Sequence, residues 1–207
     1  MFNLGGGRRR KESRNPYPRF KAIAYEIQQP PFTDSTTLLR FHRKKKMRGR
    51  VASELQVGVP ADDVWAVYSS PELPRLVVNL TPGVYQKIDI VEGDGGVGTV
   101  LDIVLTPVNP EPRTWKEKFV TIDNEKRMKV VRQIEGGYLD MGFQFYEDIF
   151  KIKANGTNSC IIRSSIVFEV ADEFEVNAAL VSSKASEDMA KAIANYVIQK
   201  KINCHKT

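Results

Sequence analysis

Cysteine and histidine are scarce in this sequence, which limits the chemistry that it can carry. Among 207 residues there are only two cysteines, Cys160 and Cys204, and two histidines, His42 and His205. Two cysteines so far apart in the chain predict free thiols rather than a disulfide framework or a metal site such as that of zinc. Both histidines fall in predicted tails, so acid–base chemistry in the body of the protein would depend on carboxylates, lysine or tyrosine.

Long apolar runs are also missing. No stretch approaches the roughly 18 consecutive apolar residues of a membrane span, and the start of the chain lacks the apolar run of a secretory signal. We therefore expect a soluble protein, cytoplasmic by default. With 42% hydrophobic and 27% charged residues, the composition is that of a globular domain with a sizeable core.

Positive charge is concentrated at one end of the chain. Residues 1–50 contain 14 Lys or Arg and only three acids, a net charge of +11, whereas the remainder carries a net charge of −5. The alkaline character of the whole chain therefore says little about what the body binds. Because basic runs are usually solvated, nucleic acid is not an expected partner.

The basic head, residues 1–46, shows no sustained helical or strand periodicity and contains a Gly-Gly-Gly-Arg-Arg-Arg stretch and four prolines. This composition predicts a largely disordered extension. Three interpretations remain open: a targeting peptide, a nucleic-acid or nuclear-import patch, and sequence upstream of the true start. Met47 directly precedes the first predicted strand, which favours the third.

From Val51 the sequence alternates between apolar and polar residues, as a half-buried strand does. Pro60 then begins a short helix, "PADDVWAVY", and a second short helical piece, "PELPRLVV", follows. Further strands succeed one another, with turns at 123–125 and 155–158. The predicted strands are residues 84–91, 100–105, 114–121, 127–135, 140–152 and 159–170.

The last segment, from about Glu173 to Lys201, predicts one long amphipathic helix, because apolar residues such as Val181, Met189 and Ile193 recur at helical spacing. The elements together predict an α+β domain over residues 47–202, with a tail at 203–207. Its expected architecture is a curved antiparallel sheet of about seven strands wrapped around the long C-terminal helix, with two short helices after the first strand. Such a sheet leaves room for an internal ligand cavity. Monomer and homodimer both remain open.

A glycine-rich stretch, "EGDGGVGT" at 92–99, is interpreted as a hairpin connection. A phosphate-binding loop would end in Gly-Lys-Ser/Thr and lead into a helix, whereas this stretch leads into a strand. Glycines at tight hairpins supply backbone conformations with positive φ.

Three ionic residues on successive strands, Glu117, Lys129 and Asp148, are candidates for chemistry. Glu117 shares a strand face with Trp115 and Phe119, which is unusual for an acid. Asp148 likewise shares a face with apolar residues, whereas the neighbours of Lys129 are weaker evidence. Each residue alone fits an ordinary surface charge, but together they outline a cavity with two carboxylates and one amine.

Such a cavity has definite chemistry. Burial raises carboxyl pKa values and lowers that of lysine, while mutual attraction opposes both shifts, so the groups could exchange protons near neutral pH. A substrate with an ammonium group and an aromatic ring would suit carboxylates among aromatic walls.

From Met47 to about Ile202 the chain resembles the birch-pollen-allergen and pathogenesis-related superfamily, and within it the norcoclaurine synthases. The resemblance covers about three quarters of the chain. Its most specific stretches are "KEKF" and "EGGYLDMG", and it also includes "ELQVGVPADDVWAVYSSPELPRL", "VEGDGGVGTVLDI" and "NSCIIRSS".

The resemblance implies a cofactor-free Pictet–Spengler condensation of dopamine with 4-hydroxyphenylacetaldehyde to (S)-norcoclaurine in alkaloid biosynthesis. The family's catalytic lysine, glutamate and aspartate match Lys129, Glu117 and Asp148. Lys129 would hold the catechol oxygen, Glu117 would remove the ring proton, and Asp148 would pass protons during iminium formation. The expected substrate-binding residues are Trp115, Tyr146, Phe119 and Met189.

Two departures from the family pattern leave other functions open. The tyrosine two places before the glutamate is Trp115 here, which replaces a hydroxyl with a donor-only indole N–H. The entrance at the closing helix reads "SKASEDM" in place of a Gly-Pro-Leu run, so Lys184, Ser186, Glu187 and Asp188 would stand near the mouth. One alternative is a noncatalytic protein that binds small aromatic ligands such as alkaloids or hormones. A weaker one is a hormone receptor of the same fold.

Overall fold

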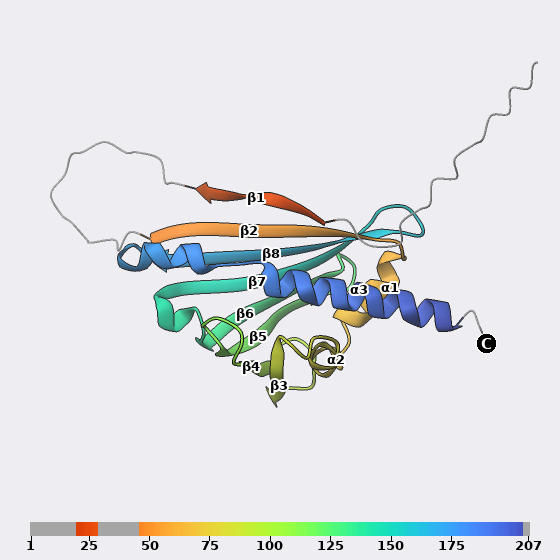
Figure 1. The fold of residues 1–207 in the computed structure, drawn as a ribbon, viewed down its shortest axis with the longest axis horizontal. Coiled ribbons are helices and arrows are strands. Elements are labelled where there is room, and N and C mark those ends of the chain that lie inside the picture. The colour runs from red at the N-terminus through yellow and green to blue at the C-terminus, as the bar shows by residue number, and fades with distance from the viewer. Residues whose placement is uncertain (1–19, 29–45, 205–207) are drawn as a thin grey trace, which may run out of the picture.

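The computed structural model of the chain describes residues 20–28 and 46–204. They form one eight-stranded antiparallel sheet in the strand order β1-β2-β8-β7-β6-β5-β4-β3, together with helices in the predicted α+β arrangement (Figure 1). The strands are β1 (Phe20–Gln28), β2 (Lys46–Val57), β3 (Tyr85–Glu92), β4 (Val100–Leu105), β5 (Thr114–Asp123), β6 (Met128–Gly136), β7 (Phe143–Ala154) and β8 (Cys160–Ala171). The helices are α1 (Ala61–Tyr68), α2 (Leu73–Leu80), α3 (Lys184–Cys204) and the 3-10 helices η1 (Leu139–Met141) and η2 (Asp172–Leu180).

Strand β1 was not predicted, because the basic head was expected to lack regular structure. Its backbone pairs with the outer edge of β2, from Phe20 opposite Leu55 to Gln28 opposite Arg48. The register shifts between Ile23 and Glu26, and such a bulge interrupts the strict alternation by which a strand is recognised in a sequence. The prediction of disorder is thus wrong for residues 20–28, and for residues 1–19 and 29–45 it falls outside the described residues.

The single C-terminal helix predicted from Glu173 is also wrong in its first part. Residues 172–180 form η2, and α3 begins only at Lys184. The intervening Val181 is extended and buried, and two serines follow it. The Ser182 hydroxyl accepts a hydrogen bond from the backbone N–H of Lys184 at 3.2 Å. Serine side chains that bond nearby backbone groups favour helix starts over helix interiors, which explains the break.

The remaining elements lie where the sequence predicts them, within a few residues at their ends. The glycine-rich stretch connects β3 to β4 as a hairpin, and Gly93, Gly95 and Gly98 all have positive φ. Helix α1 buries Val64 and Tyr68, which are one helical turn apart, against the sheet.

Helix α3 lies across the curved sheet (Figure 1). Buried side chains from the helix and the sheet form a core between them. One cluster of buried side chains joins the sheet to α1, α2 and the middle of α3, and it includes Leu55, Tyr68 and Ile193. A second cluster, with Phe143 and Phe168, packs at the other end of the sheet beneath η2. The hollow that concerns function lies along the start of α3. No helix among the described residues is both long enough and apolar enough to cross a membrane.

Candidate active site

A cavity of about 480 Å³ lies between the sheet and the start of α3. Strands β5, β6 and β7 supply one wall, and the loop between β4 and β5 supplies part of another. All seven residues that the sequence predicts to be catalytic or substrate-binding line this cavity. They are Trp115, Glu117, Phe119, Lys129, Tyr146, Asp148 and Met189.

Lys129 is buried almost completely, with 1% of its surface exposed. Its ammonium lies 3.7 Å from the centre of the Phe119 ring and donates a hydrogen bond to the backbone carbonyl of Tyr68 at 3.2 Å. Burial lowers the pKa of Lys129 to about 8, although the negative charge of Glu117 opposes this change. Lys129 is therefore charged in most molecules at neutral pH, and it can lose its proton under mildly alkaline conditions.

Glu117 lies two residues from Trp115 on β5, and both side chains leave the same face of the strand. The indole Nε1 of Trp115 donates a hydrogen bond to Oε2 of Glu117 at 2.9 Å. Burial raises the pKa of the Glu117 carboxyl, while the bond from Trp115 and the charge of Lys129 both lower it. The carboxylate is thus basic enough to accept a proton and still stabilised as an anion.

Asp148 lies on β7, the strand beyond β6. It accepts a hydrogen bond at its Oδ1 from the hydroxyl of Ser186, on α3, at 3.1 Å. The pKa of Asp148 is raised to about 7, mainly by burial and also by the negative charge of Glu117, while the hydrogen bond from Ser186 lowers it. Near neutral pH Asp148 is divided between acid and anion, which allows it to donate and to accept a proton.

Two tyrosines that sequence reasoning missed also line the cavity. Tyr138, which follows the glycine pair of "EGGYLDMG", stacks on Tyr146 with ring centres 4.4 Å apart. Tyr85, on β3, has its pKa raised by burial and then by the charges of Glu117 and Asp148. The sequence offered one indication that Tyr85 could face the cavity, because it is an aromatic residue at the start of an alternating strand.

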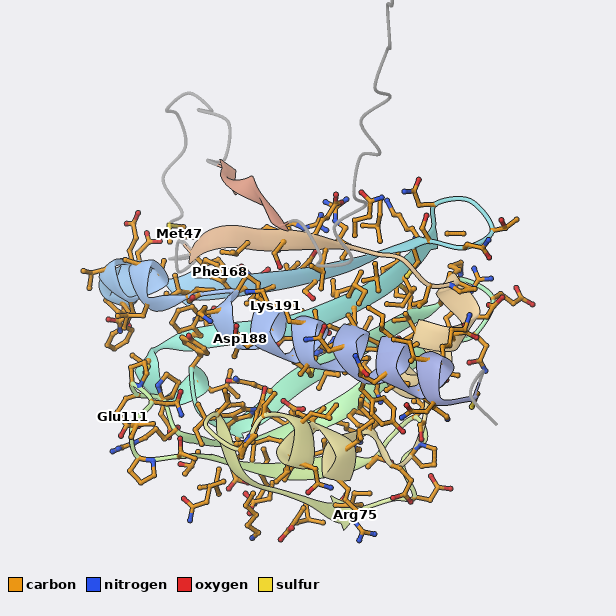
Figure 2. The ribbon with its side chains drawn as sticks, turned by 45° about the vertical axis from the view of Figure 1, so that its right-hand side comes forward. Met47, Arg75, Glu111, Phe168, Asp188 and Lys191 are labelled. Carbon is orange, nitrogen blue, oxygen red and sulfur yellow. The ribbon has the colours of Figure 1, made fainter. Side chains whose placement is uncertain are left out.

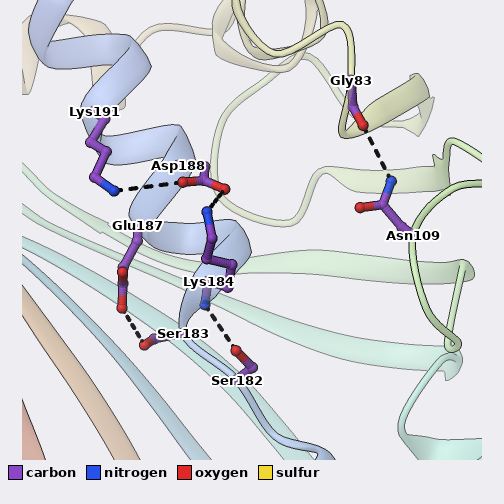
Figure 3. A network of polar contacts seen from close by, with 8 residues as sticks. All are labelled: Gly83, Asn109, Ser182, Ser183, Lys184, Glu187, Asp188 and Lys191. Atoms are coloured by element: carbon purple, nitrogen blue, oxygen red, sulfur yellow. Dashed lines mark hydrogen bonds and ion pairs between the residues drawn. The ribbon is translucent and has the colours of Figure 1, made fainter.

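The mouth of the cavity combines the start of α3 with the loop between β4 and β5. Lys184 and Asp188 line the cavity and form an ion pair with each other, and Lys191 lies 3.7 Å from the second oxygen of Asp188 (Figure 3). Glu111, on the facing loop, also lines the cavity (Figure 2). Glu187 was expected at the mouth, but it accepts a hydrogen bond from Ser183 and is not among the described residues that line the cavity.

Asn109 ties the loop between β4 and β5 to the segment before β3. Its side-chain amide donates a hydrogen bond to the carbonyl of Val84 at 3.1 Å. It also reaches the carbonyl of Gly83 at 3.4 Å (Figure 3). It also contacts the hydroxyl of Thr106 at 2.7 Å. The loop is thereby held in place by its own side chain.

Metal ligands do not gather in this part of the chain. Among the described residues, no three His, Cys, Asp or Glu side chains lie close enough together to hold a metal ion. The groups available for chemistry in the cavity are the carboxylates, the lysine and the phenols.

Comparison with known proteins gives this architecture a family. Residues 46–200 match the sequence model of the pathogenesis-related protein Bet v 1 family. The chain belongs to the Bet v 1 family. Among Bet v 1 relatives, S-norcoclaurine synthase 2 of Papaver somniferum is 46% identical over 180 residues, which covers 86% of this chain and 76% of that protein. Norbelladine synthase of Narcissus pseudonarcissus is 40% identical over 158 residues, 76% of this chain and 97% of that one.

A solved Bet v 1 structure shows the same fold at this level of identity. Norcoclaurine synthase from Thalictrum flavum, in complex with dopamine and hydroxybenzaldehyde, is similar with a TM-score of 0.71 and 37% identity. The match covers 83% of this chain and 98% of that chain. The chain is therefore a Bet v 1 protein that is similar to norcoclaurine synthases over most of its length.

Proposed function

We propose that this protein condenses dopamine with 4-hydroxyphenylacetaldehyde to (S)-norcoclaurine by a Pictet–Spengler reaction. The observation that carries the proposal is the meeting of Lys129, Glu117 and Asp148 in one cavity with aromatic walls. A solved relative at 37% identity holds dopamine and an aromatic aldehyde, which supports the assignment of the substrate class.

Proton transfer through Asp148 suits the first stage of the reaction. The amine adds to the aldehyde to give a carbinolamine, which loses water when its hydroxyl is protonated. With a pKa of about 7, Asp148 is protonated often enough to supply that proton and becomes an anion beside the iminium cation that forms. Its negative charge then stabilises the cation in a site with little water.

Lys129 and Glu117 suit the second stage, in which the catechol ring attacks the iminium carbon. The ammonium of Lys129 would hold a catechol oxygen and favour its electron-rich, deprotonated form. After the new carbon–carbon bond forms, Glu117 would remove the proton from the ring carbon and restore aromaticity. Burial raises the pKa of Glu117, which strengthens it as the base for this step.

The test is to incubate the full chain with both substrates and to resolve the product enantiomers by chiral chromatography. We expect an excess of the (S)-product above the buffer reaction. Lys129→Ala should nearly abolish this excess, and Glu117→Ala should slow its formation by about 10²–10⁴-fold, the range of a positioned acid or base.

Matched controls lie on the same two strands. Lys118, on β5, and Glu135, on β6, are exposed, so Lys118→Ala and Glu135→Gln should leave the rate unchanged. Racemic product formed at the buffer rate would instead reject the proposed activity and leave the alternative of a noncatalytic protein that binds small aromatic ligands. Equal rates in all variants would reject the roles assigned to Lys129 and Glu117.

A further inference from the structure

Trp115 is one of the two departures from the expected family pattern, and its backbone packs closely against the end of β6. It lies opposite Gly136, the last residue of β6. The next residue, Gly137, has a φ of +60° and donates a hydrogen bond from its backbone N–H to the carbonyl of Thr114 at 3.0 Å. A Cβ atom on Gly137 would stand 2.9 Å from the Cβ of Trp115, so only glycine permits this close approach.

The indole that is held in this way makes a single directed contact. Its Nε1 donates to Oε2 of Glu117 at 2.9 Å, and no other hydrogen bond to the Glu117 carboxylate is present among the described residues. Among the described residues, Oε2 of Glu117 accepts a hydrogen bond and Oε1 accepts none.

The donor at Oε2 of Glu117 is an indole, and this affects how a proton on Glu117 can move. An indole N–H donates but cannot accept, unlike a tyrosine hydroxyl, which can do both. A proton on Glu117 therefore cannot pass onward through residue 115. The hydrogen bond also favours the ionised carboxylate, which opposes the effect of burial.

We propose that Trp115 is a positioning residue that keeps Glu117 ionised and leaves Oε1 as the oxygen that accepts the ring proton. This inference rests on the proposed function for the identity of the proton, but the hydrogen bond itself can be tested without substrate. The inference gives a function to the donor-only indole N–H that replaces the family's tyrosine hydroxyl at position 115.

The first experiment uses the unmodified chain, which contains only two tryptophans, Trp65 and Trp115. The indole ¹H–¹⁵N signals are followed through a pH titration by NMR. The Trp115 signal should move as Glu117 takes up a proton. Trp65 is a built-in control, because its indole donates to the neutral amide of Asn124 at 3.0 Å and its signal should not follow this titration.

Variants then link the titration to Glu117. In Glu117→Gln the pH-dependent movement of the Trp115 signal should disappear. In Trp115→Phe, with glutamate carboxyls labelled with ¹³C, the pKa of Glu117 should rise by about one to two pH units, the loss expected for one hydrogen bond to a charged group. Trp115→Tyr restores a donor and should reverse at least half of this rise.

Kinetics test the catalytic part separately. In Trp115→Phe the acidic limb of the kcat profile should move to higher pH with Glu117, while KM changes by less than about threefold. In Trp115→Tyr the acidic limb should move back toward its pH in the unmodified chain. A purely structural role for Trp115 would lower the rate equally in both variants with no change in the limb.

The outcomes separate the two proposals. A Trp115 signal that does not titrate in the unmodified chain, or a Glu117 pKa that is equal in Trp115→Phe and the unmodified chain, would overturn the inference. If the titrations behave as expected but no (S)-product forms, the hydrogen bond stands, and both the proposed function and the proton-accepting role of Oε1 fail.

Discussion

Replacing Lys129 by methionine gives a direct measure of what the buried charge costs the fold. The side chain is 1% exposed, and burial lowers its pKa from the ordinary 10.5 to about 8. Each pH unit corresponds to about 1.4 kcal/mol, so the proton on Lys129 costs the folded state about 3 kcal/mol at neutral pH. Methionine is apolar and similar in length, so Lys129→Met removes this cost without opening a large cavity.

The sign of the effect follows from proton binding. Between pH 8 and 10.5 the unfolded chain holds the lysine proton while the folded protein has released it, so the free energy of unfolding rises with pH in this window. Lys129→Met lacks this rise. The stability advantage of the variant over the parent should therefore shrink by about 2 to 3 kcal/mol between pH 7 and 10.

Urea denaturation of both proteins at several pH values between 7 and 10 measures this difference. Titrating groups that do not interact with Lys129 contribute equally to both curves, so their contributions cancel when the two curves are subtracted. Lys153→Met serves as the control, because Lys153 is exposed on β7 and its replacement should give a difference that stays flat. A flat difference for Lys129→Met, within about 0.5 kcal/mol, would refute the burial of a charged lysine.

Two further predictions concern the groups that support the site. Ser186→Ala removes the hydroxyl that donates to Asp148, so the pKa of Asp148 should rise above its value of about 7 by about one pH unit in a ¹³C NMR titration, and an unchanged pKa would contradict the contact. Gly137→Ala should lower the free energy of unfolding by about 2 kcal/mol or more in urea, because the residue has a φ of +60° and its new Cβ would meet Trp115. Gly58→Ala, whose Cβ would meet nothing within 4 Å, is the matched control and should change stability by less than about 0.5 kcal/mol.

Much of the architecture could be predicted because its patterns are local. The strand β4 was predicted with its observed bounds, because an apolar run directly follows the glycine-rich hairpin connection. Glu117 and Asp148 were found because a charge on an apolar strand face has to be satisfied inside the protein, whereas the strand neighbours of Lys129 were weaker evidence and the family resemblance supported that residue. Glu117 and Asp148 stand on such faces, and the structure brings both to the same cavity as Lys129.

What could not be predicted depends on contacts between distant segments. Ser186 meets Asp148 across 38 positions in sequence, and no local pattern indicates such a pair. The bond from Trp115 to Glu117 joins residues that were predicted to share a face, but the sequence does not show which way the indole N–H points. The roles of these residues in catalysis remain predictions for the experiments above.

Helix α3 is one uninterrupted helix of 21 residues, and its first turns and its middle have different surroundings. Lys184 and Asp188, in its first turns, border the opening of the cavity, whereas Ile193 and Val197 are sealed into the core. Tilting the helix to widen the opening would pull these core residues out of close packing. Under the proposed function we therefore expect the Lys184 and Asp188 side chains, rather than movement of the whole helix, to influence which aldehydes enter.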